Sequence, residues 1–344
     1  MSVAGLILSN LHDGELPMLT AKRTMGAVPF GGRFRLLDFP LSAMVNAGIS
    51  EIFVVAHHNY RSLMEHIGSG KDWDMARHQG GIHILPPYSA AYANPEESYN
   101  SRLQSLVSVC GVIDRIAEEH VLCCDCDAIG TPDIGALIAA HKKSGLPMTV
   151  CEEEGGFFGS LHVWIAKTSF LRELLREAQR KRYRYFYDEL IRDQMRAGKV
   201  GTYRFAERFY RIHSLADYYR LHMLLVSNED VRRTLLECED RPLMTKIRNS
   251  PPVKYGTYAR VEGALIADGC VIEGTVRNSV LFRGVHVGEG CVVEDSVILE
   301  HGSLTGRVSL HAAVLDKHVV LGGGVSLSGH ATLPFFVEEG RVIC

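Results

Sequence analysis

The sequence predicts two domains in series, a mostly parallel α/β sheet domain and then a left-handed parallel β-helix. Short apolar strands alternate with amphipathic helices over the first two-thirds of the 344 residues, which is typical of a parallel sheet with helices on both faces. The Pro251-Pro252 pair marks a boundary, because two prolines end any helix. Beyond it the chain is rich in Gly and Val. We therefore predict a sheet domain over residues 1–235, a linker over 236–252 and a β-helix over 253–344.

Apolar runs and helical periodicity place the elements of the first domain. Strands are predicted over residues 3–9, 51–57, 121–126, 147–151 and 159–165. Helices are predicted over 41–47, 59–67, 102–119 and 132–143. The last of these begins with Pro132-Asp133, a favourable first-turn signal.

The second domain shows a six-residue period. Leu281, Val287, Val293 and Leu299 are six positions apart, as are Ile266 and Ile272. Each flat side of a left-handed β-helix takes six residues and stacks aliphatic side chains in its interior. The alternative is an irregular β-sandwich, but its strands would alternate with period two between frequent turns. Four successive matches to period six favour the β-helix.

Composition narrows the classes of partner. With 37 basic and 40 acidic residues the formal charge is −3, which gives no electrostatic reason to expect nucleic acid or an anionic membrane as partner. No apolar run is long enough to span a bilayer, and the start of the chain lacks a signal-peptide pattern. We expect a cytoplasmic protein. The nine cysteines, an odd number in a long chain, are expected to be free thiols.

One long motif carries a family resemblance. Residues 28–42 read V-P-F-G-G-R-F-R-L-L-D-F-P-L-S, and K-D-W-D follows at 71–74. With the β-helix pattern downstream, this order resembles the ADP-glucose pyrophosphorylases (glucose-1-phosphate adenylyltransferases). The resemblance implies a nucleotidyltransferase-like (Rossmann-like) first domain. It also implies glycogen biosynthesis, in which ATP and glucose 1-phosphate give ADP-glucose and pyrophosphate, with Mg²⁺ for the reaction.

The phosphate-binding parts of that family are degraded in this chain. Active members place G-G-x-G-x-R-L after the first strand, whereas here only Gly14 remains, flanked by Asp13 and Glu15. Glycines let backbone N–H groups approach an anion, and these carboxylates should repel it. Met25 stands where the family has a lysine. The segment for the sugar phosphate is shortened after Cys151 and contains no lysine from 144 to 166.

The metal site is altered as well. Asp127 aligns with the family's first metal-binding aspartate, so it is a vestigial catalytic candidate and a metal ligand. The second aspartate is replaced by Arg211, and a guanidinium cannot ligate Mg²⁺. The missing ligand argues against Mg²⁺ in this chain. The charge reversal suggests that Arg211 pairs with Asp127 and fills the vacant cation position. In the alternative, Asp127 caps a helix near Pro132 or is solvated.

Basic residues suggest a second site. The resemblance implies that Lys22, Arg23, Arg33 and Arg35 bind substrate or phosphorylated effectors, and that His57 stands where the family has an adenine-contacting glutamine. Surface salt bridges are the alternative for the basic cluster. Hexapeptide acyltransferases use a histidine base, but His286, His301 and His311 fit exposed loops better. The basic aromatic run at 180–187 fits a helix surface better than a single-stranded nucleic acid site.

Together, the departures resemble the family's D-type subunit. That resemblance implies a regulatory or activating subunit with little activity alone, in a heterotetramer with a catalytic subunit. The candidate ligands are ATP, glucose 1-phosphate or sugar-phosphate effectors. Two alternatives stay open: an active sugar-1-phosphate nucleotidyltransferase with an altered site, and a stand-alone metabolite sensor.

Overall fold

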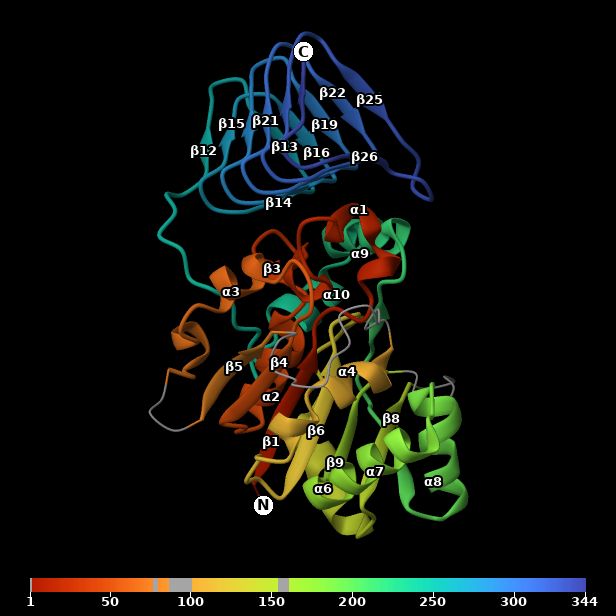
Figure 1. Cartoon of the computed structure of the whole chain (residues 1–344). Coiled ribbons are helices and arrows are strands. Elements are labelled where there is room, and N and C mark those ends of the chain that lie inside the picture. Colours follow the sequence, from red (N-terminus) through yellow and green to blue (C-terminus); the bar gives the residue numbers. More distant parts are fainter. Residues whose placement is uncertain (1, 77–79, 87–100, 154–160) are drawn as a thin grey trace.

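An N-terminal α/β domain lies beneath a C-terminal β-helix in the computed structural model (Figure 1). The structure describes residues 2–76, 80–86, 101–153 and 161–344. Between them, α10 ends at Leu236 and the first β-helix strand begins at Lys254, and the described chain from 237 to 253 forms neither helix nor strand. The predicted combination of a mostly parallel sheet domain and a parallel β-helix is confirmed.

The centre of the first domain is a seven-stranded sheet in the order β10-β8-β9-β6-β1-β4-β5, as far as the chain is described. Its strands are β1 (Val3–Leu8), β4 (Glu51–Val55), β5 (Gly81–Leu85), β6 (His120–Asp125), β8 (Met148–Glu152), β9 (Trp164–Lys167) and β10 (Val200–Arg204). All pairings are parallel except those of β9, which runs antiparallel to β6 and β8.

Helices cover both faces of this sheet, so its central strands are apolar on both sides. Along β6 and just beyond it, Cys123 lies in one buried cluster, and Cys124 and Cys126 lie in the other. The helices are α1 (Pro17–Thr20), α2 (Asp38–Asn46), α3 (Arg61–Ile67), α4 (Arg102–Ser108), α5 (Cys110–Ile113), α6 (Ile134–Ser144), α7 (Thr168–Lys181), α8 (Arg192–Arg196), α9 (Leu215–Ser227) and α10 (Glu229–Leu236). None of the helices in the described chain is long and apolar enough to cross a membrane.

Two predicted elements differ from the structure. The single helix expected over 102–119 is divided into α4 and α5 and ends at Ile113. Val109, Gly111 and Val112 have low helix propensity, which explains the break. The strand expected over 159–165 starts only at Trp164, with residues 159 and 160 outside the described chain.

The second domain winds three parallel sheets into a β-helix. Val287 pairs with Leu304 and Leu304 with Leu321, so these coils are 17 residues long (304 − 287 and 321 − 304). The first sheet contains β12 (Lys254–Tyr255), β15 (Val271–Ile272), β18 (His286–Val287), β21 (Ser303–Leu304), β24 (Val320–Leu321) and β27 (Val342–Ile343). The second contains β13 (Arg260–Glu262), β16 (Thr275–Arg277), β19 (Val292–Glu294), β22 (Ser309–His311) and β25 (Ser326–Ser328). The third contains β14 (Leu265–Ile266), β17 (Val280–Leu281), β20 (Val297–Ile298), β23 (Ala313–Leu315) and β26 (Phe335–Val337).

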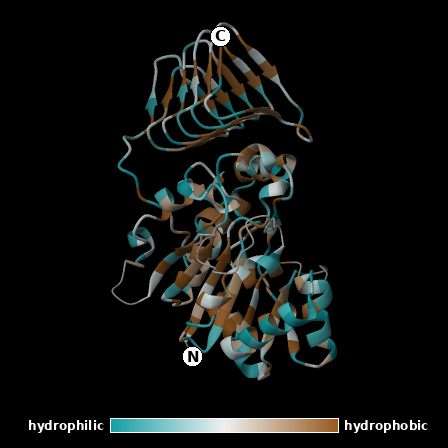
Figure 2. Cartoon of the chain, in the orientation of Figure 1, coloured by the Kyte–Doolittle hydropathy of each residue, from teal (hydrophilic) through white to brown (hydrophobic). Residues whose placement is uncertain are grey.

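The central strands of the third sheet, β17, β20 and β23, are buried on both sides, because the outer face of the sheet packs on the first domain. Leu281, Val287 and Val293 point into the β-helix as the period predicts, but Leu299 does not. Leu299 belongs instead to the buried cluster that includes Phe30 and Leu37 of the first domain, and Ile298 takes its place inside the coil. Figure 2 shows apolar residues on both the central sheet and the β-helix strands. A shared core therefore joins the two domains.

Candidate functional site

Two histidines and two aspartates converge at one end of the central sheet. β1 and β6 are parallel neighbours in which Leu8 pairs with Asp125, so both strands end at the same edge. His12 follows β1, and Asp125 and Asp127 lie at and just after the end of β6. His162 precedes β9, whose antiparallel direction brings its start to that edge. Ligand-binding groups gather at the carboxyl ends of strands in such sheets, and this is the candidate functional site.

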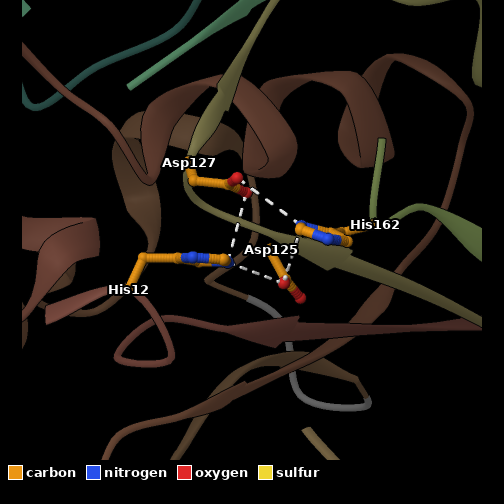
Figure 3. A group of neighbouring side chains, drawn as sticks. All are labelled: His12, Asp125, Asp127 and His162. Atoms are coloured by element: carbon orange, nitrogen blue, oxygen red, sulfur yellow. Dashed lines mark hydrogen bonds and ion pairs between the residues drawn. The ribbon is translucent and has the colours of Figure 1, made fainter. Parts of the chain in front are cut away.

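The side chains of the cluster lie close enough to share one ligand (Figure 3). One ligand atom from each of the four residues lies within 4.8 Å of all the others. Nε2 of His12 is 3.0 Å from Oδ2 of Asp125 and 3.4 Å from Oδ1 of Asp127. Nδ1 of His162 is 3.5 Å from a carboxylate oxygen of each aspartate. Both carboxylates are fully buried.

Arginine side chains complete the cluster. Arg211 forms an ion pair with Oδ2 of Asp127, and Arg102, at the start of α4, forms one with Oδ2 of Asp125. Arg211 is positioned by a two-stranded antiparallel ribbon, in which β11 (Tyr210–Arg211) pairs with β7 (Ala128–Ile129). Next to this ribbon, the Ile212 N–H donates to the Asp127 carbonyl at 3.1 Å. The ion pair suggested by the charge reversal is therefore present. Asp127 is neither solvated nor a helix cap, since Asp133 caps α6 by accepting from the Ala136 N–H.

The charges of the cluster stabilise one another. Burial acts to lower the pKa of His12, but Asp127 and the hydrogen bonds to Asp125 and Glu15 raise it to about 10. Burial acts to raise the pKa of Asp127, yet His12, His162 and Arg211 hold it well below its usual range. Burial lowers the pKa of His162. Near neutral pH, two negative charges therefore face three positive ones from His12, Arg102 and Arg211.

These residues do not fit Mg²⁺, although they form the one group within the described chain that could hold a metal ion. Mg²⁺ demands a near-octahedral set of oxygen ligands and keeps several waters. Here each carboxylate is already paired with a guanidinium, and the remaining donors are imidazole nitrogens. A divalent ion would have to displace Arg211 from Asp127.

The degraded loop after β1 is held by its own carboxylates. Oδ1 of Asp13 accepts the Met25 N–H at 2.6 Å, and Met25 is fully buried. Glu15 contacts His12 at 3.0 Å and His213 at 2.9 Å. Burial raises the pKa of Asp13 to about 7. These contacts hold the loop to Met25 and His213 through its own side chains.

Only part of the predicted basic cluster comes together. Lys22, Arg23 and Arg35 line a pocket of about 310 Å³ between the domains. Arg33 does not line it, and its guanidinium packs over the Phe34 ring. His57 is buried beyond β4, where burial and His58 lower its pKa to about 4. The basic pocket is therefore separate from His57.

Arg23 is paired across the domain interface. Its guanidinium donates to Asp316 and Glu339 of the β-helix, both at 2.8 Å. Nη1 of Arg35 donates to the carbonyl and hydroxyl oxygens of Ser62, a neutral partner. Arg23 therefore forms salt bridges as in the alternative, but they lie buried at the domain interface and not on the surface.

Sequence reasoning selected Asp127 and Arg211 but missed their neighbours. Asp125 carried a signal, since it lies in the strand expected over 121–126 and precedes Asp127 by only two residues at the end where ligand-binding groups gather. Arg102, His12 and His162 come from separate segments, and nothing in their local sequence linked them. The shortened sugar-phosphate segment at 154–160 lies outside the described residues.

The fold and this edge of the sheet define a nucleotidyltransferase-type protein with a hexapeptide β-helix. The Nucleotidyl transferase family profile matches residues 14–152, and the profile described as GlmU-like, C-terminal hexapeptide matches residues 253–330.

Curated relatives refine this class. The chain is 33% identical over 347 residues to the glycogen biosynthesis protein GlgD of Geobacillus stearothermophilus, covering 98% of this chain and 96% of the relative. It is 29% identical to GlgD of Bacillus subtilis, with the same coverage. A glucose-1-phosphate adenylyltransferase of Clostridium perfringens is 28% identical over 86% of this chain and 83% of its own length. The chain belongs to the GlgD family.

Replacing Arg211 with methionine should destabilise the protein. Asp127 would stay buried and lose its ion pair with Arg211, although His12 would remain 3.4 Å from Oδ1, so the cost is up to about 3–5 kcal/mol. Urea unfolding followed by circular dichroism measures the change. Arg208→Met, three residues away and exposed, should stay within about 0.5 kcal/mol of wild type. Adding Asp127→Asn to Arg211→Met should recover part of the loss, and equal stability of the two arginine variants would contradict the role of the pair.

The raised pKa of His12 predicts a loss of stability at alkaline pH. A group whose pKa is higher in the folded protein contributes stability below its unfolded value, here 6.5, and loses that contribution as the pH approaches about 10. The wild-type protein should therefore lose more stability over this pH window than His12→Gln. Urea midpoints measured along a pH series test this, with the exposed His330→Gln as control. Parallel curves for wild type and His12→Gln would refute it.

Proposed function

We propose that this chain is a regulatory or activating subunit in glycogen biosynthesis, with little or no turnover of its own. It would assemble in the cytoplasm with a catalytic glucose-1-phosphate adenylyltransferase, in a heterotetramer. Its similarity to both GlgD proteins and glucose-1-phosphate adenylyltransferases supports this assignment. The observation that carries it is the ion pair between Arg211 and Asp127.

Nucleotidyl transfer needs charge neutralisation where phosphates react. Enzymes of this kind supply mainly positioning and electrostatic stabilisation, in which metal ions bridge phosphate oxygens. In this chain, Asp127 forms an ion pair with Arg211. The loop after β1 carries the acidic residues Asp13 and Glu15. Losing one stabilising contact costs about 10²–10³ in rate. Several such losses together support very low activity for the chain alone.

We further propose that the interdomain pocket binds a phosphorylated effector. Six cationic side chains and three carboxylates line it, which gives a formal charge of +3 (6 − 3) before its two histidines are counted. The cations are Lys22, Arg23, Arg35, Arg61, Arg248 and Lys317. Arginine suits bidentate phosphate contacts. Because both domains contribute residues to the lining, a bound anion would change the contacts between the two domains.

The proposed function is tested by ADP-glucose formation at a fixed amount of the catalytic subunit, with increasing amounts of this chain. We expect no turnover without the partner, and a rise in rate or in apparent substrate affinity that saturates at a fixed ratio of the two chains. Turnover by this chain alone, comparable to that of the partner, would favour the alternative of an active transferase. Effector binding without association or any change in the partner would favour a stand-alone sensor.

The effector pocket is tested with inorganic phosphate and pyrophosphate by calorimetry. Arg248 is exposed and lines the pocket, so Arg248→Gln should weaken pyrophosphate binding roughly tenfold by removing one charge-assisted contact. Arg33→Gln removes the same charge from a nearby exposed position outside the pocket and should leave the affinity unchanged. Equal weakening by both variants would indicate general electrostatic attraction in place of a site.

A further inference from the structure

We propose that Arg211 and Arg102 take the place of a divalent cation, and that this exchange closes the edge of the sheet to metal. In this account the folded chain needs no divalent ion at Asp127, and replacing Arg211 with aspartate reopens a cation site. The inference concerns the cluster itself, so it holds whether or not the chain activates a partner.

The first argument is the occupancy of the carboxylate oxygens. Oδ2 of Asp127 contacts the guanidinium of Arg211 and lies 3.5 Å from Nδ1 of His162, and Oδ1 lies 3.4 Å from Nε2 of His12. Oδ2 of Asp125 contacts Arg102 and lies 3.0 Å from the same Nε2. A metal ion bound to these oxygens would meet two fixed positive charges at contact distance.

The second argument is that Arg211 cannot leave easily. Its backbone is paired with Ala128 in the β7–β11 ribbon, and its Nη2 is 3.1 Å from Nδ1 of His162. The side chain is largely buried, with 16% of its surface exposed. Moving the guanidinium into solvent would leave the buried Asp127 with His12 as its nearest cation, while Asp125 keeps Arg102. Removing one partner of a buried ion pair costs several kcal/mol unless another cation replaces it.

The third argument is that the same backbone position suits a ligand. A carboxylate at position 211 would project from the ribbon toward Asp127 and leave the volume of the guanidinium for an ion and its waters. Carboxylate oxygens are the ligands that Mg²⁺ and Mn²⁺ prefer. The single substitution Arg211→Asp therefore changes a neutralising cation into a third acidic ligand beside Asp125 and Asp127.

The test measures Mn²⁺ binding by loss of the free-ion electron paramagnetic resonance signal, with no substrate present. The wild type and the control Arg208→Asp, which makes the same charge change at an exposed position, should bind alike and weakly. Arg211→Asp should bind one Mn²⁺ per chain roughly tenfold more tightly or better. Adding Asp127→Asn to Arg211→Asp should remove that gain. A folded Arg211→Asp protein that binds no better than Arg208→Asp overturns the proposal.

A second measurement needs no variant at position 211. Two imidazoles and two carboxylates also form a donor set that suits Zn²⁺. We expect the melting temperature of the wild-type chain to be the same in a chelator as in Mn²⁺, Mg²⁺ or low Zn²⁺. Stabilisation of the wild type by any of these ions that disappears in Asp127→Asn would show that the arginines leave a metal site open, and the inference would be wrong.

Discussion

Two buried aspartates at the end of β6 set the main constraint on the first domain. Asp125 and Asp127 lose their hydration on folding, so each needs a positive partner within contact distance. Arg102 from α4, Arg211 from β11 and His12 after β1 supply those partners from three separate segments. Satisfying the two carboxylates therefore fixes the start of α4, the β7–β11 ribbon and the loop after β1 relative to the central sheet.

The architecture was predictable because it rests on repeated local patterns. Period-six spacing placed Leu281, Val287 and Val293 inside the β-helix, and apolar runs located the strands around β1 and β6. Leu299 shows where such a pattern fails. The six-residue period does not show which β-helix sheet packs on another domain. An apolar residue on the outer face of that sheet, such as Leu299, therefore resembles one that points into the β-helix. Likewise, the spacing of apolar residues over 102–119 predicted one helix, because it takes no account of the weak helix propensity near Val109, where the structure divides α4 from α5.

The site was only partly predictable for a different reason. Arg211 and Asp127 could be found from the sequence, because an arginine stands where the resembling family has its second metal-binding aspartate. The loss of a ligand and the gain of a positive charge are both visible in an alignment. His162 had no comparable signal. It lies where β9 runs antiparallel to its neighbours, and that direction brings the start of β9 to the edge where the parallel strands end. Strand direction is a tertiary property, so the cluster is complete only once the sheet is assembled.

The segment after β1 connects this cluster to the domain interface. His12 contacts Asp125, and Asp13 accepts a hydrogen bond from the Met25 N–H. Arg23, which lies between Asp13 and Met25 in the sequence, pairs with Asp316 and Glu339 of the β-helix. A ligand that competed for Arg23 would therefore change the contacts between the domains. The carboxylates of the cluster are paired with cations, whereas the lining of the interdomain pocket carries an excess of positive charge. An anion bound in this pocket would contact residues of both domains, so its binding and the packing of the domains would be linked.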